Sequence, residues 1–366
     1  FNGKQEIYGL ERIEVLKGAS SVLYGSSGPG GIINMVSKRP STTPLRELNV
    51  ELGSFGRKQL SGDFGGPIDE RGEWSYRLSV LQRDSDTFVD YVPDDRSFIA
   101  PALKWQPNAR TSLTFLAEYH RDRTAYVYGL PGPGTVLPNP NGRLPRNFFP
   151  GEPGYDKFNL DRYSVGYLLE HAFSDSLKLR QNVRYFQAEN DYNSASIWGL
   201  AADQRFTNNR GAQDRRDRST ATTVDTSLQY QGTHGKVQHT ALIGFDYSTP
   251  KHKTERYNRD GQPIDLYAPA YGQTYGDAVP AGNSSVLQTK RMGLYLQDQM
   301  KIDEKWVVVL GGRYDTLRYN ERALFSDEIW ADNEKSSAFT KRAGLVYLAD
   351  GGFAPFLSYS ESYEPT

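Results

Sequence analysis

The sequence predicts an all-β transmembrane barrel of antiparallel strands, and three observations predict it. From about residue 45 onward apolar and polar side chains alternate with a period of two, which is typical of strands with two different faces. The connections between these strands are alternately short and long. Strands of about ten residues joined in this way are typical of outer-membrane barrels, in which one strand face meets lipid and the other meets the lumen.

The alternating segments account for about thirteen strands, and several of them end in an aromatic residue. Tyr76, Leu78 and Val80 form the first clear series, with Arg77 and Ser79 between them. Further series follow at 113–119, 163–169, 177–185, 222–230, 241–247, 292–296 and 306–314.

The connections indicate which ends of the strands lie together. Tight joints rich in Gly, Asp, Asn or Pro are expected at 65–72, 106–110, 174–176, 231–235, 302–305 and 349–352. Long connections are expected at 85–96, 123–160, 190–217, 248–285 and 318–337, and loops of such length usually carry function. The first hairpin departs from this pattern, because its outer turn at 53–56 is short.

Composition excludes several other classes. With 43 Lys and Arg against 44 Asp and Glu, the chain has no global field to hold a nucleic acid. It has no Cys, and its five His show no metal-ligand spacing, so we expect no metal site, no intrinsic cofactor and no enzyme. The longest uninterrupted apolar run, 306–310, is far too short for a membrane helix. The alternative from pattern alone is a soluble propeller or sandwich, but no repeat with a blade signature is present.

The first 40 residues carry a motif that the barrel pattern does not explain. The segment Leu10–Gly18 reads LERIEVLKG, Ser21–Gly25 reads SVLYG, and Pro29–Pro40 reads PGGIINMVSKRP. Together they resemble the C-terminal part of the plug domain of TonB-dependent outer-membrane receptors, with Leu10 and Ala19 as departures. Segments 130–142, 295–299 and 358–365 are similar to siderophore receptors of the ferrichrome and ferrioxamine type.

This resemblance implies a 22-stranded barrel with a small α+β plug in its lumen. Residues 1–44 would be the C-terminal part of the plug, here called the plug segment, and 45–366 the N-terminal and middle part of the barrel. The start of the plug, the TonB box and the last strands would lie outside this chain. The implied function is uptake of an iron(III)-siderophore across the bacterial outer membrane with energy from TonB, the iron being carried by the ligand.

Within that family the ligand class stays open. A hydroxamate siderophore leads, and a catecholate, haem, cobalamin or glycan is the alternative. A passive or structural barrel is a weaker alternative to a receptor, because a passive pore has no use for a plug domain.

The resemblance also implies ligand-binding residues. Tyr8 stands at the spacing of a plug tyrosine that reaches the ligand in ferrichrome receptors. Tyr126, Tyr128 and Trp198 lie in the predicted long loops near aromatic positions of the family. Aromatic faces and phenol or indole donors suit a compact, amide-rich, nearly neutral chelate, although a girdle at the membrane interface would also use such residues.

Charged residues give two further hypotheses. Arg12, Lys17 and their plug neighbours Glu14, Lys38 and Arg39 could pair with lumen-facing carboxylates, for which Glu361 and Glu364 are the candidates. Arg215, Arg216 and Arg218 could contact lipid and lipopolysaccharide in the outer leaflet, or form a solvated cluster in a loop. Phages or bacteriocins are further candidate partners of the long loops.

Overall fold

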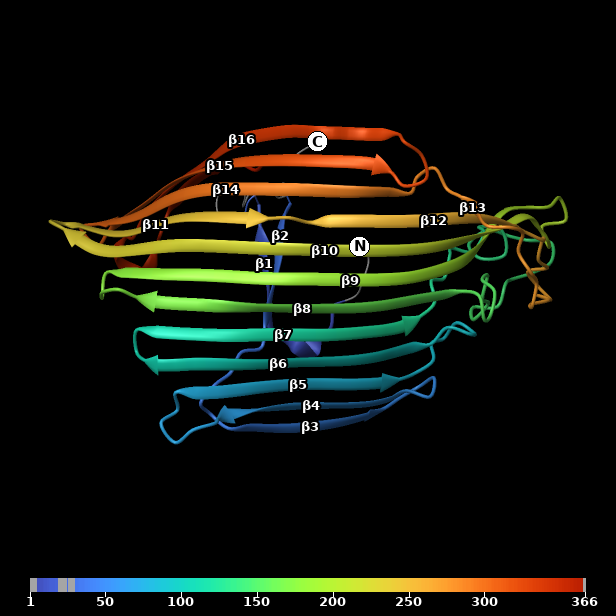
Figure 1. The fold of residues 1–366 in the computed structure, drawn as a ribbon, viewed down its shortest axis with the longest axis horizontal. Coiled ribbons are helices and arrows are strands. Elements are labelled where there is room, and N and C mark those ends of the chain that lie inside the picture. The colour runs from blue at the N-terminus through green and yellow to red at the C-terminus, as the bar shows by residue number, and fades with distance from the viewer. Residues whose placement is uncertain (1–4, 19–24, 26–29, 365–366) are drawn as a thin grey trace.

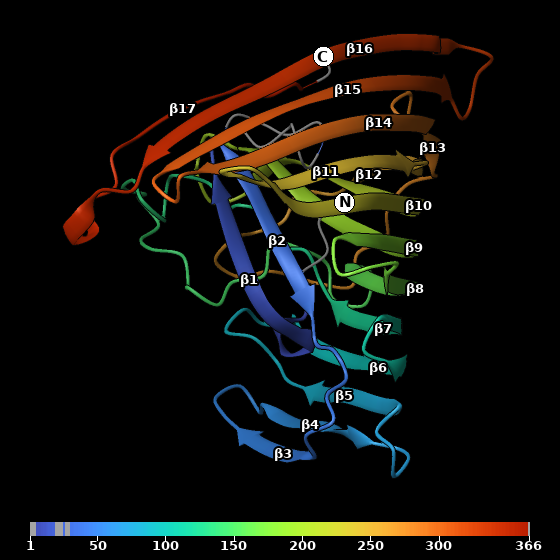
Figure 2. The same ribbon diagram turned by 90° about the vertical axis from the view of Figure 1, so that its left-hand side faces the viewer.

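The computed structural model describes residues 5–18, 25 and 30–364 of the chain. One large, strongly curved antiparallel sheet forms most of the molecule, and a separate two-stranded hairpin lies on its concave side (Figures 1 and 2). None of the helices in these described ranges is long and apolar enough to cross a membrane.

The elements follow the chain in a simple order. The plug segment contains the 3-10 turn η1 (Ile7–Gly9), β1 (Leu10–Lys17) and β2 (Gly31–Ser37). The sheet contains β3 (Leu45–Leu52), β4 (Lys58–Pro67), β5 (Trp74–Asp84), β6 (Asp94–Asn108), β7 (Thr111–Thr124), β8 (Lys157–Ala172), β9 (Leu177–Leu200), β10 (Thr207–His234), β11 (Val237–Ser248), β12 (Lys251–Gly261), β13 (Val279–Pro280), β14 (Ser285–Ile302), β15 (Trp306–Ala323), β16 (Ile329–Tyr347), the 3-10 turn η2 (Asp350–Gly352) and β17 (Phe356–Ser360).

The large sheet is a meander, with β3 and β17 at its two edges. Its continuous path has the order β17-β16-β15-β14-β11-β10-β9-β8-β7-β6-β5-β4-β3, which confirms the expected thirteen strands. β12 lies beyond β11 and pairs with β10 and β14, the neighbours that β11 also has. β11 and β12 therefore act as one long strand that is interrupted at residues 249 and 250 (Figure 1).

Short and long connections lie at opposite ends of the sheet, as predicted (Figure 1). However, two of the predicted long loops are mostly strand, and a third, 248–285, contains β12 and β13. Most of 190–217 continues β9 and β10, and most of 318–337 continues β15 and β16, so only 201–206 and 324–328 connect these pairs. The cause is that these strand extensions carry polar residues on both faces and only scattered apolar ones, which removes the regular alternation that marks a half-buried strand.

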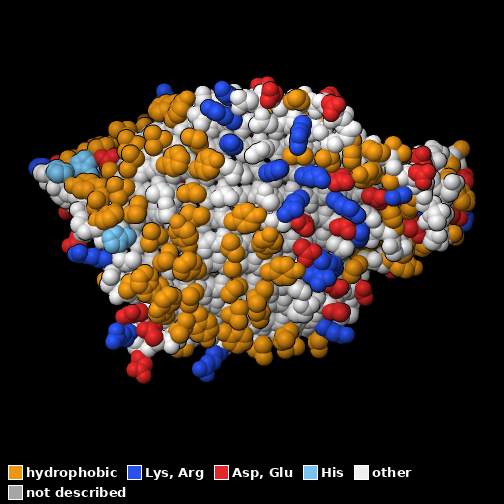
Figure 3. All heavy atoms as spheres, in the orientation of Figure 1, with side chains coloured by type: hydrophobic (Ala, Val, Ile, Leu, Met, Phe, Trp, Pro, Cys, Tyr) orange, Lys and Arg blue, Asp and Glu red, His pale blue; other side chains and the backbone are white. Residues whose placement is uncertain are grey.

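The two faces of the sheet differ in polarity because the strand register places apolar side chains next to one another on one face and polar side chains next to one another on the other. On the convex face Phe245, Leu294, Tyr314 and Phe339 stand side by side across β11, β14, β15 and β16, and all four are exposed. On the concave face the row Arg96, Asp122, Leu160, Asn190 and Asp217 crosses β6 to β10, and all five are buried. Figure 3 shows the apolar side chains of the convex face, with a zone of charged side chains between them and the long-loop end. This is the polarity expected of a barrel wall.

The plug segment forms a hairpin whose strands pair in continuous register from Arg12 opposite Val36 to Lys17 opposite Gly31. Gly31 has φ of 118°, and a Cβ there would lie 2.0 Å from the carbonyl oxygen of Leu16, so only glycine fits. At the other end of the hairpin, a Cβ on Gly9 would lie 2.3 Å from Cζ of Phe98 on β6. The backbone of the plug segment thus rests directly on the concave wall. The motif residues Ser21–Tyr24 lie outside the described residues.

At the long-loop end the connections fold on one another rather than extending freely. Leu144, Phe148, Ile264 and Leu266 form a buried cluster that joins loop 125–156 to loop 262–278. The fully buried Arg210 on β10 donates to Glu152 Oε2 at 2.8 Å and to the carbonyl oxygens of Pro150 and Gly151. We call these loops and their contacts with β9 and β10 the loop cap.

Asp156 is a second carboxyl group of the loop cap, and its side chain is partly buried. Its two oxygens accept hydrogen bonds from the backbone N–H groups of Ala195 at 3.0 Å and Glu152 at 2.7 Å. Burial, reinforced by the nearby charge of Glu152, raises the pKa of Asp156 to about 7. The loop cap therefore contains a carboxyl group that titrates near neutral pH.

Candidate ligand cavity

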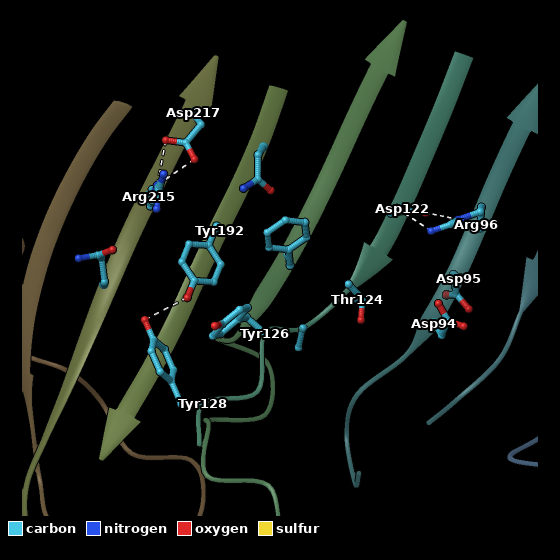
Figure 4. Close-up of a pocket in the computed structure, with 14 residues that line it drawn as sticks. Asp94, Asp95, Arg96, Asp122, Thr124, Tyr126, Tyr128, Tyr192, Arg215 and Asp217 are labelled. Atoms are coloured by element: carbon cyan, nitrogen blue, oxygen red, sulfur yellow. Dashed lines mark hydrogen bonds and ion pairs between the residues drawn. The ribbon is translucent and has the colours of Figure 1, made fainter. Parts of the chain in front are cut away.

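A cavity of about 540 Å³ opens on the concave face near the long-loop end. It lies where β6 to β10 meet the first residues of loop 125–156 (Figure 4). Two cross-strand rows position its wall: the row of Arg96, Asp122, Asn190 and Asp217, and the next row toward the loops, with Thr124, Phe158, Tyr192 and Arg215. Since register fixes these rows, the sheet holds the side chains of the cavity in place.

Four aromatic rings line one side of the cavity. Tyr126 lies with its ring centroid 5.0 Å from that of Tyr128 and 5.6 Å from that of Tyr192, in both cases edge to face. Phe158 packs against Tyr192 with a centroid distance of 5.7 Å. The hydroxyl of Tyr192 donates to that of Tyr128 at 3.1 Å, which links strand β9 to the loop (Figure 4). Edge-to-face contacts of this kind stabilise the cluster beyond simple burial.

Charged side chains of the lining lie on both sides of these rings (Figure 4). Arg96 donates to both oxygens of Asp122, at 2.6 and 3.0 Å, and Arg215 pairs with Asp217 at 2.8 Å. Asp94 and Asp95 complete the lining. Four carboxylates and two guanidinium groups therefore border the cavity, which makes its wall acidic overall.

The structure places the predicted ligand-binding residues in different positions. Tyr126 and Tyr128 line the cavity together. Trp198 lies six residues beyond Tyr192 on β9, about 20 Å along an extended strand, and is 65% exposed. Tyr8 borders a second cavity, between the plug segment and β3 to β6, where it donates to Glu47 Oε1 at 3.1 Å. Lys38 Nζ lies 4.2 Å from the centre of its ring.

Sequence reasoning missed Phe158 and Tyr192. Both fall in stretches read as loop, since Asn190, Asp191 and Asn193 surround Tyr192 with polar residues. The only sequence signal for these two residues is their spacing. Each lies an even number of residues from a position of its strand whose side chain faces the concave side.

Among the described residues, Lys38 is the predicted plug cation that pairs with the wall, and its partner is Asp63 rather than Glu361 or Glu364. Arg12 pairs with Glu14 within the plug segment, and Glu361 accepts from the hydroxyl of Tyr359 and the backbone of Lys341. Lys17 and Glu364 lie in the described ranges without an observed ion pair to each other or to Arg12 and Glu361.

Two ion pairs join the plug segment to the wall in the described residues. Glu6 binds Arg96 at 2.8 Å, and Lys38 binds Asp63 at 2.6 Å. Lys38 was among the plug cations considered, whereas Glu6 and its partner were not.

The prediction that Arg215, Arg216 and Arg218 lie in or beside a loop is wrong, because all three belong to β10. Alternation along the strand separates them: Arg215 lines the cavity, while Arg216 and Arg218 lie on the convex face.

In the described part of the chain, no group of three or more His, Asp or Glu side chains is placed to hold a metal ion.

Comparison with known proteins agrees with this architecture. Residues 104–366 match the family TonB dependent receptor-like, beta-barrel, and residues 3–32 match the TonB-dependent Receptor Plug Domain. The chain therefore belongs to the TonB-dependent receptor family, as its motifs predicted.

Two curated relatives give a finer comparison. The chain is 34% identical to the ferrioxamine B receptor of Salmonella typhimurium (strain SL1344) over 358 residues, which cover 98% of this chain and 50% of that protein. It is also 34% identical to the ferrichrome outer membrane transporter/phage receptor of Escherichia coli (strain K12), with 98% and 51% covered. The chain thus spans about half the length of these relatives.

Among solved structures, the siderophore receptor PiuA from Acinetobacter baumannii superimposes with a TM-score of 0.87 at 20% identity. The superposition covers 100% of this chain and 56% of that one, and it supports the same fold.

Proposed function

We propose that this chain is part of an outer-membrane receptor that binds an iron(III)-siderophore of the hydroxamate class and imports it with energy from TonB. The observation that carries the proposal is the cavity formed by Tyr126, Tyr128, Phe158 and Tyr192 on the concave face, beside the plug segment. The names of the two curated relatives, which refer to ferrioxamine B and ferrichrome, support the same ligand class.

The chemistry of the cavity favours a compact ligand without strong negative charge. Aromatic faces exclude water and fit the apolar chains of a chelate, while the phenol groups of Tyr126 and Tyr128 are donors for hydroxamate oxygens. A ferric catecholate carries several negative charges and would meet four carboxylates against two guanidinium groups. The negative charges of such a ligand and those of the lining carboxylates repel one another, so the lining favours a neutral or cationic chelate.

In this proposal residues 1–44 belong to the plug and 45–366 to the barrel. Tyr8 and Trp198 act outside the cavity, Tyr8 on the plug side and Trp198 nearer the loops. Arg12, Lys17, Glu361 and Glu364 remain candidates for plug–barrel pairing in the whole receptor, where more of the plug and barrel is present.

Lipopolysaccharide is the proposed lipid partner. The convex face carries Arg218 opposite Lys253, and Lys290, Arg318 and Lys335 in one cross-strand row. Such cations attract the phosphate groups of an anionic leaflet. The loop cap, in turn, is a candidate surface for phages and bacteriocins.

Binding of iron-loaded and iron-free siderophores to the whole receptor in detergent, followed by tyrosine and tryptophan fluorescence, tests the proposal. We expect sub-micromolar binding of a ferric hydroxamate, weakened by Tyr192→Ala and unchanged in Tyr314→Ala, which alters the convex face. Failure of every ferric siderophore to bind would reject the ligand class.

A further inference from the structure

Arg96 on β6 lies between the ligand cavity and the plug segment. Its guanidinium group lines the cavity of about 540 Å³ and also borders the second cavity of about 600 Å³, which is lined by Glu6, Tyr8 and Lys38 on the plug side. One side chain therefore faces the proposed ligand and the plug at the same time.

Two of the contacts of Arg96 stay within the wall. Its Nε and one terminal nitrogen donate to Asp122, which stands directly opposite on β7. Asp122 also lies 2.9 Å from Nε2 of the fully buried His120. The other ring nitrogen of that histidine lies 3.0 Å from Arg162 on β8. The wall thus fixes Asp122 independently of the plug.

The remaining contact of Arg96 crosses to the plug segment. Its other terminal nitrogen donates to Glu6 Oε2 at 2.8 Å, and both side chains are less than a tenth exposed. The second oxygen of the same carboxylate accepts from the backbone N–H of Tyr8 at 2.8 Å and caps η1. Glu6 therefore holds the first turn of the plug segment and orients Arg96 with one carboxylate.

We propose that Glu6 is a positioning residue that couples occupancy of the ligand cavity to anchoring of the plug segment, through Arg96. This inference rests on the proposed function. A ligand that fills the cavity removes water from one side of Arg96 and Asp122. In the lower local dielectric the pairing of Arg96 with Glu6 strengthens. By reciprocity, an anchored Glu6 favours ligand binding by the same factor, although it does not line the cavity.

The test uses the whole receptor with ferric ferrioxamine B and ferrichrome as probes. Glu6→Gln keeps an oxygen that can cap η1 but removes the charge that Arg96 meets. We expect this variant to bind the probes three- to tenfold more weakly than the unmodified receptor. Glu11→Gln is the matched control, because Glu11 is an exposed carboxylate of the same segment and lies on β1; we expect unchanged affinity.

Hydrogen exchange of residues 5–17 supplies the second readout. We expect ligand to slow exchange there at least threefold in the unmodified receptor, and this effect to disappear in Glu6→Gln. Arg96→Lys, which removes the forked contact but keeps the charge, should also lose the effect. An unchanged far-ultraviolet circular dichroism spectrum and melting temperature establish that the variants are folded.

The two possible failures are distinct. If the unmodified receptor binds neither probe, the proposed function fails and this inference fails with it. If the receptor binds a probe and Glu6→Gln binds it equally well with the same protection of residues 5–17, the coupling is overturned while the proposed function stands.

Discussion

Replacing Glu152 by Ala should open the loop cap. Glu152 is the only carboxylate within ion-pair distance of the fully buried Arg210 in the described residues, and its other oxygen accepts from the backbone of Gly272 at 2.5 Å. The substitution leaves a buried, unpaired guanidinium group. Removing one partner of a buried ion pair costs about 3–5 kcal/mol.

The loop cap responds to this cost by local opening, since loops at the ends of strands open well below the global unfolding free energy. A change of about 3–5 kcal/mol corresponds to roughly two to three and a half orders of magnitude in the opening equilibrium. We expect faster hydrogen exchange by that factor in peptides covering 144–156 and 206–212, up to the rate of fully exposed amides, with β14 to β16 unaffected.

A double variant separates the unpaired charge from the loss of the side chain itself. Glu152→Ala with Arg210→Met removes both charges, and we expect most of the protection to return, because an apolar pair replaces a buried ion pair at little cost. Acceleration below about fivefold in Glu152→Ala, or no recovery in the double variant, would refute the reasoning.

Three further predictions follow from other positions. Gly31→Ala should destabilise the plug hairpin by at least about 1 kcal/mol, because φ is 118° and the new Cβ would meet the carbonyl oxygen of Leu16. Hydrogen exchange in β1 and β2 measures this loss. Gly30→Ala is the control, since no atom lies within 4 Å of a Cβ at that position. Because the pKa of Asp156 is raised to about 7, the folded loop cap binds more protons than the open one. The protection of its amides against hydrogen exchange should therefore fall as pH rises from 5 to 8. Protection that does not change with pH, or that falls equally in Asp156→Asn, would contradict this. Tyr192→Ala should weaken binding of a ferric hydroxamate by roughly tenfold or more, and Trp198→Ala by less, because Trp198 lies outside the cavity. Fluorescence titration measures both affinities. A larger loss of affinity in Trp198→Ala than in Tyr192→Ala would indicate that the ligand binds nearer the loops.

The sequence allowed the barrel to be predicted where one strand face meets lipid. Around Phe245 and Leu294 the apolar side chains alternate with polar ones, and the period alone identifies the strands. Beyond the lipid zone this signal ends. From Asn208 to Arg218 nearly every residue is polar, so β10 was read as loop although it is continuous there.

The site was predictable only in part for a related reason. Tyr126 and Tyr128 were found through resemblance to the family, but Tyr192 lies within a stretch read as loop. Glu6 and Arg96 are 90 residues apart in the chain. No local pattern reveals a pair that only the placement of the hairpin against the wall brings together.

Uptake of radiolabelled iron tests the central claim most directly. Cells that lack their own hydroxamate receptors would carry the whole receptor, with and without TonB. The account predicts uptake of iron from a ferric hydroxamate that requires TonB and falls in Tyr192→Ala. Absence of uptake from every hydroxamate, or uptake that persists without TonB, would contradict it.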